Sequence, residues 1–446
     1  MTRGPSARRR RPRALIGISA LVVVAFVACE PAPPVTPGPS ASAALVAPEP
    51  SVSAGPPPEP GHELYGFVPY WEMDEGIVAH LADTPLSTIG LFSVTHDAAG
   101  ALRTTASGYQ RITGDVGRQI IEGAHKRGQR VELVYTSFGQ ARNRRLLRRE
   151  SLQNAVIASL VATVGDLKLD GVNVDIEALD PDLIVAYGGF VGRLRDALVA
   201  ADPGDQVSVA TGANILGATM AAGANQAGAD RIFLMAYDYR TGASSPGATS
   251  PLDRRDGDEK DLPWSLDLYA SLGVPPGKLL LGLPLYGVTW PVVGPDIGAS
   301  ETGRGEAWIL RNHLDLLRDP KAVPQRDEIE SVEVYALGSD GSVGPPLTAS
   351  PDAPPSGAPS ASPASAPSPS PSATARPAKS ARPSTSPAAV TWNAVYVDSP
   401  ETLATKLELA RERGLAGSGF WAIGYERGLP AYTELMRRFA TDEPLS

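Results

Sequence analysis

Eight short apolar runs recur between residues 64 and 424, and this repetition constrains the fold more than any other feature. They cover residues 64–71, 87–94, 130–139, 170–178, 206–211, 231–239, 278–287 and 417–424. Stretches with helical apolar spacing lie between many of them, at 116–128, 151–168, 181–201 and 401–414. Strands that alternate with helices predict βαβ units and a parallel sheet. Eight repeats favour an α/β fold of the (β/α)8 TIM-barrel type. The periodicity also allows a doubly wound sheet, although no GxGxxG follows the first run to support dinucleotide binding.

Two low-complexity segments lie outside this pattern. Residues 29–61 are mainly Pro, Ala, Ser and Val, which predicts a disordered tether. Residues 345–389 are rich in Pro, Ser and Ala, and only one strand–helix unit follows them. We therefore predict a long disordered insertion before the last β/α unit, which is tolerable because the cost of closing a loop grows slowly with its length. The barrel domain is predicted to cover residues 62–440.

The N-terminal segment is predicted to carry a targeting signal. A basic stretch at 8–13 precedes an apolar run at 14–28 that is too short for a comfortable membrane-spanning helix. The run ends in FVAC, which resembles a bacterial lipoprotein signal, so residues 1–28 would be removed and Cys29 lipidated. Phe26 replaces the usual Leu, which leaves ordinary signal-peptide cleavage open. We expect a protein of the cell envelope, anchored by lipid at a periplasmic or outer-membrane surface, or secreted if Cys29 is not lipidated.

The fourth apolar run, LDGVNVDIEA, contains unexpected polar residues. If it is a strand, Asn173, Asp175 and Glu177 share one face and the apolar residues share the other. In a barrel the polar face points inward, with Glu177 near the C-terminal mouth where active sites lie. Buried polar groups are costly unless they are used or satisfied, so the alternatives are a catalytic site and a structural hydrogen-bond network.

These residues also resemble a known signature. DGVNVDIE resembles the DxxDxDxE motif of glycoside hydrolase family 18, the chitinase-like enzymes; Asp170, Asp175 and Glu177 match it, and Asn173 stands where Asp is frequent. The Asn variant resembles the spore-cortex and peptidoglycan-lytic branch more than the digestive chitinases. Further similar motifs follow the family's strand order over residues 63–435: GFVPYW (66–71), TSFGQ (136–140), LMAYDY (234–239), LGLPLYG (281–287) and GLAGSGFWAIGYE (414–426).

The resemblance implies a glycosidase that uses substrate-assisted catalysis. In that mechanism the N-acetyl carbonyl of the sugar attacks its own anomeric carbon, so only one carboxyl must transfer a proton. Glu177 would be the general acid and then the base. Asp175 would orient the acetamido group and raise the pKa of Glu177 by like-charge proximity. Tyr237 would donate a hydrogen bond to the acetamido oxygen.

The remaining predicted site residues bind or surround the sugar. Trp421 would form the apolar floor, with simple barrel packing as the alternative. Asn173 could hold Asp175 by a hydrogen bond but cannot titrate, so we expect no third coupled carboxylate in the pH dependence of activity. The other predicted substrate-binding residues are Asp170, Met235, Asp238, Phe67 and Tyr286.

Several other functions are disfavoured by composition. The net charge of −9 argues against a nucleic-acid binder. The five histidines have no metal-ligand spacing, so we expect no metal and no other cofactor. The basic run at 141–150 is more typical of a solvated face, although it could favour anionic wall polymers.

The sequence therefore predicts an envelope-attached, monomeric glycosidase that cleaves β-1,4 linkages at N-acetylglucosamine with retention of configuration. Peptidoglycan and chitin-type glycans are both possible substrates. Two alternatives remain: a non-catalytic, lectin-like barrel that binds such glycans, and a structural surface lipoprotein. The presence of Asp175, Glu177 and Tyr237 argues against the lectin, because decayed members of the family commonly lose the acid.

Overall fold

The computed structural model of the protein describes residues 61–344 and 390–445. The predicted signal peptide, Cys29, almost all of the predicted tether and the insertion at 345–389 lie outside these residues and stay predictions. Among the helices of the described ranges, none combines the length and the apolar character needed to cross a membrane.

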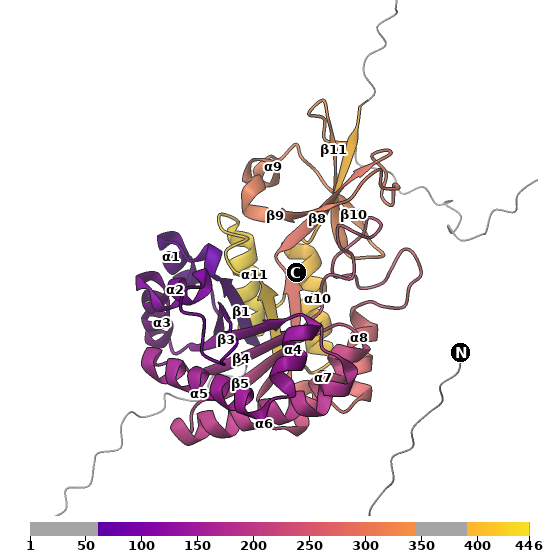
Figure 1. Cartoon of the computed structure of the whole chain (residues 1–446). Helices are drawn as coiled ribbons and strands as arrows, with labels where there is room; N and C mark the ends of the chain where they lie inside the picture. The colour runs from indigo at the N-terminus through magenta and orange to yellow at the C-terminus, as the bar shows by residue number, and fades with distance from the viewer. Residues whose placement is uncertain (1–60, 345–389, 446) are drawn as a thin grey trace, which may run out of the picture. The chain divides into compact units, whose positions relative to one another are not determined.

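Eight parallel strands form a closed barrel in the order β1-β13-β7-β6-β5-β4-β3-β2 (Figure 1). Each of the eight predicted runs contributes one strand to the barrel, so the prediction of a (β/α)8 TIM barrel is confirmed. The strands are β1 (Glu63–Pro69), β2 (Thr88–Val94), β3 (Arg130–Phe138), β4 (Gly171–Glu177), β5 (Gln206–Gly212), β6 (Arg231–Met235), β7 (Leu279–Pro284) and β13 (Gly417–Trp421).

Helices surround the barrel, and α5, α6 and α7 pack side by side outside strands β4 and β5 (Figure 1). The four predicted helical stretches correspond to α3, α5, α6 and α10. The helices are α1 (Glu75–Asp83), α2 (Ser107–Thr113), α3 (Asp115–Lys126), α4 (Gln140–Leu147), α5 (Glu150–Leu167), α6 (Ile184–Ala201), α7 (Ile215–Gln226), α8 (Leu262–Ser271), α9 (Leu314–Arg318), α10 (Pro400–Glu412) and α11 (Pro430–Ala440).

Helix α10 shows how local sequence fixes a helix boundary. The hydroxyl of Ser399 accepts a hydrogen bond from the backbone N–H of Thr402 at 3.3 Å, and the Thr402 hydroxyl accepts one from the N–H of Ser399 at 2.9 Å. This reciprocal capping satisfies two N–H groups that a helix start leaves unpaired. Pro400 occupies the first helical position, where its missing N–H costs nothing.

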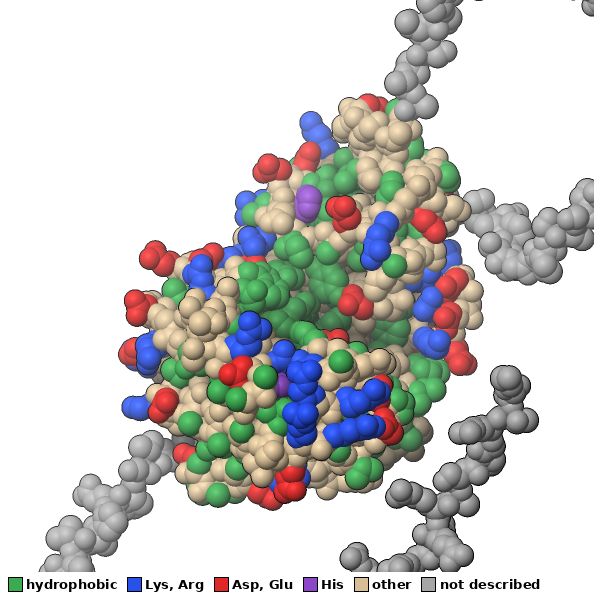
Figure 2. All heavy atoms as spheres, in the orientation of Figure 1, with side chains coloured by type: hydrophobic (Ala, Val, Ile, Leu, Met, Phe, Trp, Pro, Cys, Tyr) green, Lys and Arg blue, Asp and Glu red, His purple; other side chains and the backbone are tan. Residues whose placement is uncertain are grey.

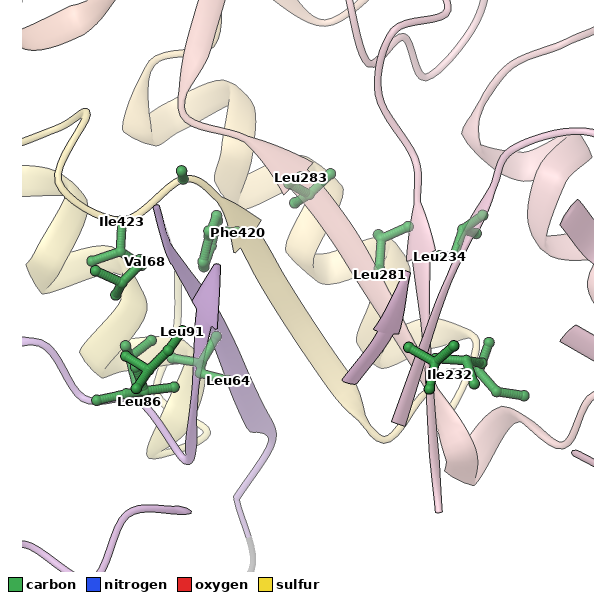
Figure 3. Close-up of a cluster of buried hydrophobic side chains, with 14 of the residues drawn as sticks. Leu64, Val68, Leu86, Leu91, Ile232, Leu234, Leu281, Leu283, Phe420 and Ile423 are labelled. Carbon is green, nitrogen blue, oxygen red and sulfur yellow. The ribbon is translucent and has the colours of Figure 1, made fainter. Parts of the chain in front are cut away.

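The period-two alternation of the strands separates two apolar layers. Leu64 and Val68 of β1 point outward and belong to the layer between strands and helices, part of which Figure 3 shows. Tyr65 and Phe67 of the same strand point inward and fill the barrel. Gly66 lies in the outer layer, where a Cβ atom would come within 2.6 Å of Leu86 and 2.7 Å of Ile423. The outward alternation thus builds the core, while the inward alternation is available for a site.

A second, antiparallel sheet lies in the sequence between β7 and β13, and the sequence analysis did not predict it. Its order is β10-β11-β12-β8-β9, with β8 (Tyr286–Val292), β9 (Glu306–Ile309), β10 (Gln325–Asp327), β11 (Val332–Gly338) and β12 (Trp392–Val397). The run at 278–287 is two strands, because the chain leaves β7 at Pro284 and starts β8 at Tyr286. Residues 345–389 separate β11 from β12, so the insertion interrupts this sheet.

Candidate active site

A cavity of about 690 Å³ opens at the C-terminal ends of the barrel strands. Its lining comes from β1, β2, β3, β4, β5, β6 and β13, and from Tyr286 at the start of β8. Figure 2 shows a hollow on this face of the molecule in which hydrophobic side chains gather, with Lys and Arg side chains close to its edge. Barrels of this type carry their active sites at this end.

Eight of the ten predicted catalytic and substrate-binding residues line this cavity. Two come from β4, three from the end of β6 and the residues after it, and one each from β1, β8 and β13. They are Asp175, Glu177, Met235, Tyr237, Asp238, Phe67, Tyr286 and Trp421.

The two carboxyl groups of β4 differ in environment. Asp175 is 5% exposed, and its Oδ1 has no hydrogen-bond partner in the part of the chain that the structure describes. Burial, reinforced by the charge of Glu177, raises the pKa of Asp175 well above its usual value. Glu177 is exposed at the strand end, and partial desolvation together with the charge of Asp238 raises its pKa too. Both groups therefore hold a proton at a higher pH than ordinary carboxyls. The charge of Asp238 adds to the desolvation of Glu177. Asp175 and Glu177 also repel each other when both are ionised, as the resemblance implied, and this repulsion is felt most by the more deeply buried Asp175.

Two tyrosines and Asp238 form the wall beside these carboxyls. The Tyr286 hydroxyl donates a hydrogen bond to Oδ1 of Asp238, and the Asp238 N–H donates to Thr249 Oγ1 at 2.9 Å. The ring centroids of Tyr237 and Tyr286 are 6.3 Å apart in an edge-to-face arrangement. Within the described residues the Tyr237 hydroxyl has no hydrogen-bond partner, so it is available to a ligand in the cavity. Asp238 is thus held as an acceptor, while Tyr237 keeps a free donor.

An aromatic cluster forms the floor, and the sequence analysis missed most of it. The Trp421 ring lies 4.7 Å from Phe92, 5.7 Å from Phe67 and 6.3 Å from Trp71, measured between centroids. Trp71 and Phe138 also line the cavity and are 47% and 48% exposed. Trp71 follows the first strand directly, at the barrel end where sites form, and this position was the signal that could have identified it. Large exposed aromatic faces in a concave site suit the apolar faces of a sugar.

The prediction that Asn173 contacts substrate is wrong. Asn173 is fully buried and does not line the cavity. It lies two residues before Asp175 on the inward face of β4, which places it about 6–7 Å deeper in the barrel. Its Nδ2 donates to Ser208 Oγ at 2.7 Å, and its Oδ1 has no partner among the described residues. The predicted hydrogen bond between Asn173 and Asp175 is therefore also absent.

The prediction that Asp170 binds substrate is wrong for the same geometric reason. Asp170 precedes β4 while Glu177 ends it, so the two lie on the order of 20 Å apart along the strand direction. Oδ2 of Asp170 accepts a hydrogen bond from the Val131 N–H at 2.6 Å and lies 2.9 Å from His125 Nε2. Asp170 thus ties β4 to β3 and α3 at the end of the barrel opposite to the cavity.

No group of three or more His, Cys, Asp or Glu side chains in residues 61–344 and 390–445 is arranged to hold a metal ion. Three histidines instead pair with single side chains: His80 with Glu426 at 2.6 Å, His125 with Asp170, and His96 with the Tyr135 hydroxyl at 2.7 Å. These contacts account for His80, His96 and His125 as structural residues.

Comparison with known sequences gives one family and three curated relatives. The family model for glycosyl hydrolases family 18 matches residues 133–426. The oviduct-specific glycoprotein of Ovis aries is 33% identical over 115 residues, which cover 26% of this chain and 19% of that protein. Chitotriosidase-1 of Mus musculus is 34% identical over 85 residues, covering 17% of this chain and 18% of that protein. The chain spans less than a fifth of the length of the curated relatives it matches.

Solved structures of low sequence identity share the fold. The spore cortex-lytic enzyme SleL of Bacillus cereus gives a TM-score of 0.60 at 16% identity, covering 85% of this chain and 74% of that one. A class V chitinase from Nicotiana tobaccum gives 0.62 at 14% identity, with 85% and 99% coverage. A family 18 N-acetylglucosaminidase from Paenibacillus barengoltzii gives 0.60 at 17% identity, with 84% and 98% coverage.

Proposed function

Because the chain belongs to glycosyl hydrolase family 18, we propose that it is a glycosidase that hydrolyses β-1,4 linkages at N-acetylglucosamine residues with retention of configuration. The observation that carries this proposal is the pair Asp175 and Glu177, which project from one strand end into an aromatic-floored cavity. The names of similar structures, which include chitinases and an N-acetylglucosaminidase, support the same substrate class. Hydrolysis of N-acetylglucosamine oligomers by the purified protein tests it.

The proposed reaction uses the substrate's own acetamido group as the nucleophile. Glu177 gives its proton to the glycosidic oxygen while the acetamido carbonyl oxygen attacks the anomeric carbon, so the bond to the leaving sugar breaks and an oxazolinium forms. Asp175 accepts a hydrogen bond from the acetamido N–H and stabilises the positive charge, and Tyr237 donates to the acetamido oxygen. Glu177, now ionised, takes a proton from water, which attacks the same carbon and restores the acetamide.

The charge of Asp238 sets part of the pH dependence. Since burial and this charge raise the pKa of Glu177, the acid form persists to higher pH than in an ordinary glutamate. Asp238→Asn removes the charge and makes ionised Glu177 less unfavourable, so the pKa falls. We expect the alkaline limb of kcat/KM against pH to move to lower pH. Asp319→Asn, which removes a charge on an exposed turn outside the cavity, should leave the profile unchanged, and an unmoved limb in Asp238→Asn contradicts this role.

A second concave site beside the cavity favours an anionic glycan among the possible substrates. It has a volume of about 280 Å³, and its lining includes Arg103, Arg142 and Arg145 together with one acidic residue, Asp97, whose Oδ1 accepts hydrogen bonds from two backbone N–H groups of its own turn. Arg142 Nη2 donates to Thr95 Oγ1 at 2.8 Å, and Thr95 lies two residues beyond Ser93, which lines the main cavity. The guanidinium groups of Arg103 and Arg145 form no ion pair or hydrogen bond within the described ranges. We call Arg103, Arg142 and Arg145 together the arginine rim.

Two neighbouring basic residues of the same segment are already neutralised. Arg144 pairs with Asp180, and Arg148 pairs with Asp182 at 2.7 Å. Within the run at 141–150, Arg144 and Arg148 thus form a solvated face of ion pairs, as the sequence suggested. Arg142 and Arg145 of the same run belong to the arginine rim. Arginine recognises carboxylates with two parallel hydrogen bonds. Peptidoglycan carries lactyl and peptide carboxylates on its glycan strand, whereas chitin is neutral, so the arginine rim supports peptidoglycan as the substrate.

The double variant Arg103→Gln/Arg145→Gln separates the two polymers. Each partly exposed ion pair contributes about 0.2–1 kcal/mol, so we expect kcat/KM on soluble peptidoglycan fragments to fall roughly three- to tenfold. Cleavage of neutral chitooligosaccharides should not change. Arg144→Gln/Arg148→Gln is the matched control, because its guanidinium groups are paired within the protein. Equal losses on both substrates, or no loss on peptidoglycan, would rule out the arginine rim as an anion subsite.

The place of action is proposed from the N-terminal sequence alone. The FVAC motif supports lipid attachment at Cys29, and the tether at 29–61 would separate the barrel from the membrane. Expression in a bacterial host with a labelled fatty acid tests this: wild type should carry the label and partition with membranes, and Cys29→Ser should do neither. An unlabelled wild type would favour the secreted form. We propose that the barrel acts as a monomer.

A further inference from the structure

A chain of four buried polar side chains lies beneath the active-site cavity. Asn173 Nδ2 donates to Ser208 Oγ at 2.7 Å, the Ser208 hydroxyl donates to Glu132 Oε2, and the Tyr65 hydroxyl donates to the same oxygen at 2.9 Å. The four residues come from β4, β5, β3 and β1, and each is at most 2% exposed. None of them touches the cavity, so the proposed reaction does not use them directly. A carboxyl group at this depth is costly to bury unless hydrogen bonds satisfy it, and the two donated by Ser208 and Tyr65 reduce this cost for Glu132.

The direction of these hydrogen bonds determines the orientation of the Asn173 amide. Because Glu132 Oε2 accepts from Ser208, the single hydroxyl hydrogen of Ser208 is used and its oxygen must accept from Asn173. The Asn173 amide nitrogen therefore donates to Ser208, and the amide oxygen makes no hydrogen bond to that residue. Oδ1 of Asn173 and Oδ1 of Asp175 are both buried without a partner in the described part of the chain. They belong to neighbouring residues on the inward face of β4.

A proton on Asp175 removes the repulsion between two neighbouring acceptor oxygens, Oδ1 of Asn173 and Oδ1 of Asp175. An ionised Asp175 offers only acceptors and is repelled by the Asn173 carbonyl dipole on the same strand face, whereas a protonated Asp175 carries an O–H that can point toward that carbonyl. With the opposite amide orientation, Asn173 would present N–H groups and favour the ionised form of Asp175. The orientation of the amide thus biases the protonation state of a residue that contacts the substrate.

We propose that Glu132 is a positioning residue that, through Ser208 and Asn173, keeps Asp175 protonated in the resting enzyme. Glu132 biases the protonation of Asp175 but does not take its proton. When substrate binds, that proton leaves to solvent through the cavity that Asp175 lines, so Asp175 is ionised as it accepts from the acetamido N–H. This inference rests on the proposed function for its catalytic meaning, but the proton on Asp175 can be observed without turnover. It also revises the expectation that no third carboxyl takes part in the pH dependence.

The surroundings of Glu132 support a titratable role at neutral pH. Burial raises the pKa of Glu132 to about 7, against the stabilising hydrogen bonds from Ser208 and Tyr65. The charged groups that act on it are Arg130, which favours the ionised form, and Asp230, which opposes it. Ionised Glu132 holds the hydrogen-bond chain in the order described, so the bias on Asp175 is strongest above this pKa.

The test is a carbon-13 NMR titration of the Asp175 carboxyl in protein labelled at aspartate, with the signal assigned by its loss in Asp175→Asn. In Glu132→Gln, the new amide can donate to Ser208, whose hydroxyl then donates to the Asn173 carbonyl and turns the Asn173 N–H groups toward Asp175. The Asp175 titration should move to lower pH than in wild type. Ser208→Ala breaks the same chain by a smaller change and should shift it in the same direction.

Two further variants make the assignment specific. Tyr65→Phe removes a hydrogen bond that lowers the pKa of Glu132 but keeps the Ser208–Asn173 contact, so Glu132 should ionise at higher pH and the Asp175 titration should shift in the same direction as in Glu132→Gln, but less. Asn173→Asp in the Glu132→Gln background supplies a titratable partner directly and should restore a high apparent pKa. An Asp175 titration that is unchanged in both Glu132→Gln and Ser208→Ala overturns the proposal. Absence of glycosidase activity with these shifts present would count against the proposed function alone.

Discussion

Glu177→Gln is expected to lower kcat on chitooligosaccharides by roughly 10²–10⁴-fold, the usual contribution of a general acid. Gln has nearly the same shape and keeps a hydrogen-bonding group at the strand end, but it cannot transfer a proton to the glycosidic oxygen. The lining of the cavity, including the aromatic floor around Trp421, is otherwise intact. Substrate binding, followed by the fluorescence of the cavity tryptophans Trp71 and Trp421, should therefore persist while cleavage is lost.

Comparison of Glu177→Gln with wild type also separates the competing functions. A lectin-like barrel would bind the oligomers without cleavage in both proteins, and a structural lipoprotein would neither bind nor cleave. Glu328→Gln is a matched control, because this glutamate has an 83% exposed side chain and does not line the cavity. Wild-type activity in Glu177→Gln would remove Glu177 from the mechanism.

Asp175→Asn is expected to lower kcat by about 10²–10³-fold, as for the loss of one preorganised electrostatic contact to a charged transition state. The amide can still accept a hydrogen bond from the acetamido N–H, but it offers no negative charge to the oxazolinium. Since Asp175 and Glu177 act on the same step, the double variant should lose less than the product of the two single losses. The test is to measure kcat on one oligomer for wild type, the two single variants and the double variant.

Asp175→Asn should also be at least as stable as wild type at neutral pH. Burial raises the folded-state pKa of Asp175, so this group favours folding fully only below its unfolded pKa and loses that contribution as pH rises through the folded value. At pH 7 the folded wild type either holds a proton that the unfolded chain would release or carries a buried negative charge, and either one lowers its stability. The amide in the variant does not titrate, so the variant has neither cost. Thermal unfolding should give a Tm for the variant that equals or exceeds wild type at pH 7, with a smaller advantage at pH 3. A large drop in Tm would indicate that lost activity reflects misfolding.

The barrel was predictable because its signals are local. Each strand is a short apolar run, and each predicted helix has apolar spacing and end signals within its own residues. The face shared by Asp175 and Glu177 follows from strand alternation alone. Periodicity alone could not place Tyr237 and Trp421 in the same site as this pair. They were assigned to the site because LMAYDY and GLAGSGFWAIGYE resemble family motifs.

The predictions that failed concern how deep a side chain lies in the barrel and how segments distant in the sequence pack together. The motif spacing groups Asp170 and Asn173 with the catalytic pair, but only the strand boundaries show that Asp170 lies at the opposite end and Asn173 lies below the cavity. Phe138 ends an apolar strand, so in the sequence it cannot be distinguished from a core residue, whereas Trp71 was marked only by its position just beyond the first strand. The second sheet has strands of three to seven residues without intervening helices of the barrel type, and its small core around Trp290 and Tyr396 forms only through antiparallel pairing between distant segments.

The configuration of the first product tests the central claim, that Glu177 serves a substrate-assisted reaction in this cavity. Proton NMR can follow the hydrolysis of a chitooligosaccharide by wild-type protein before the products mutarotate. Attack by the acetamido group followed by water inverts the anomeric carbon twice, so the β-anomer should appear first. Initial release of the α-anomer, which a direct attack by water would give, contradicts the account.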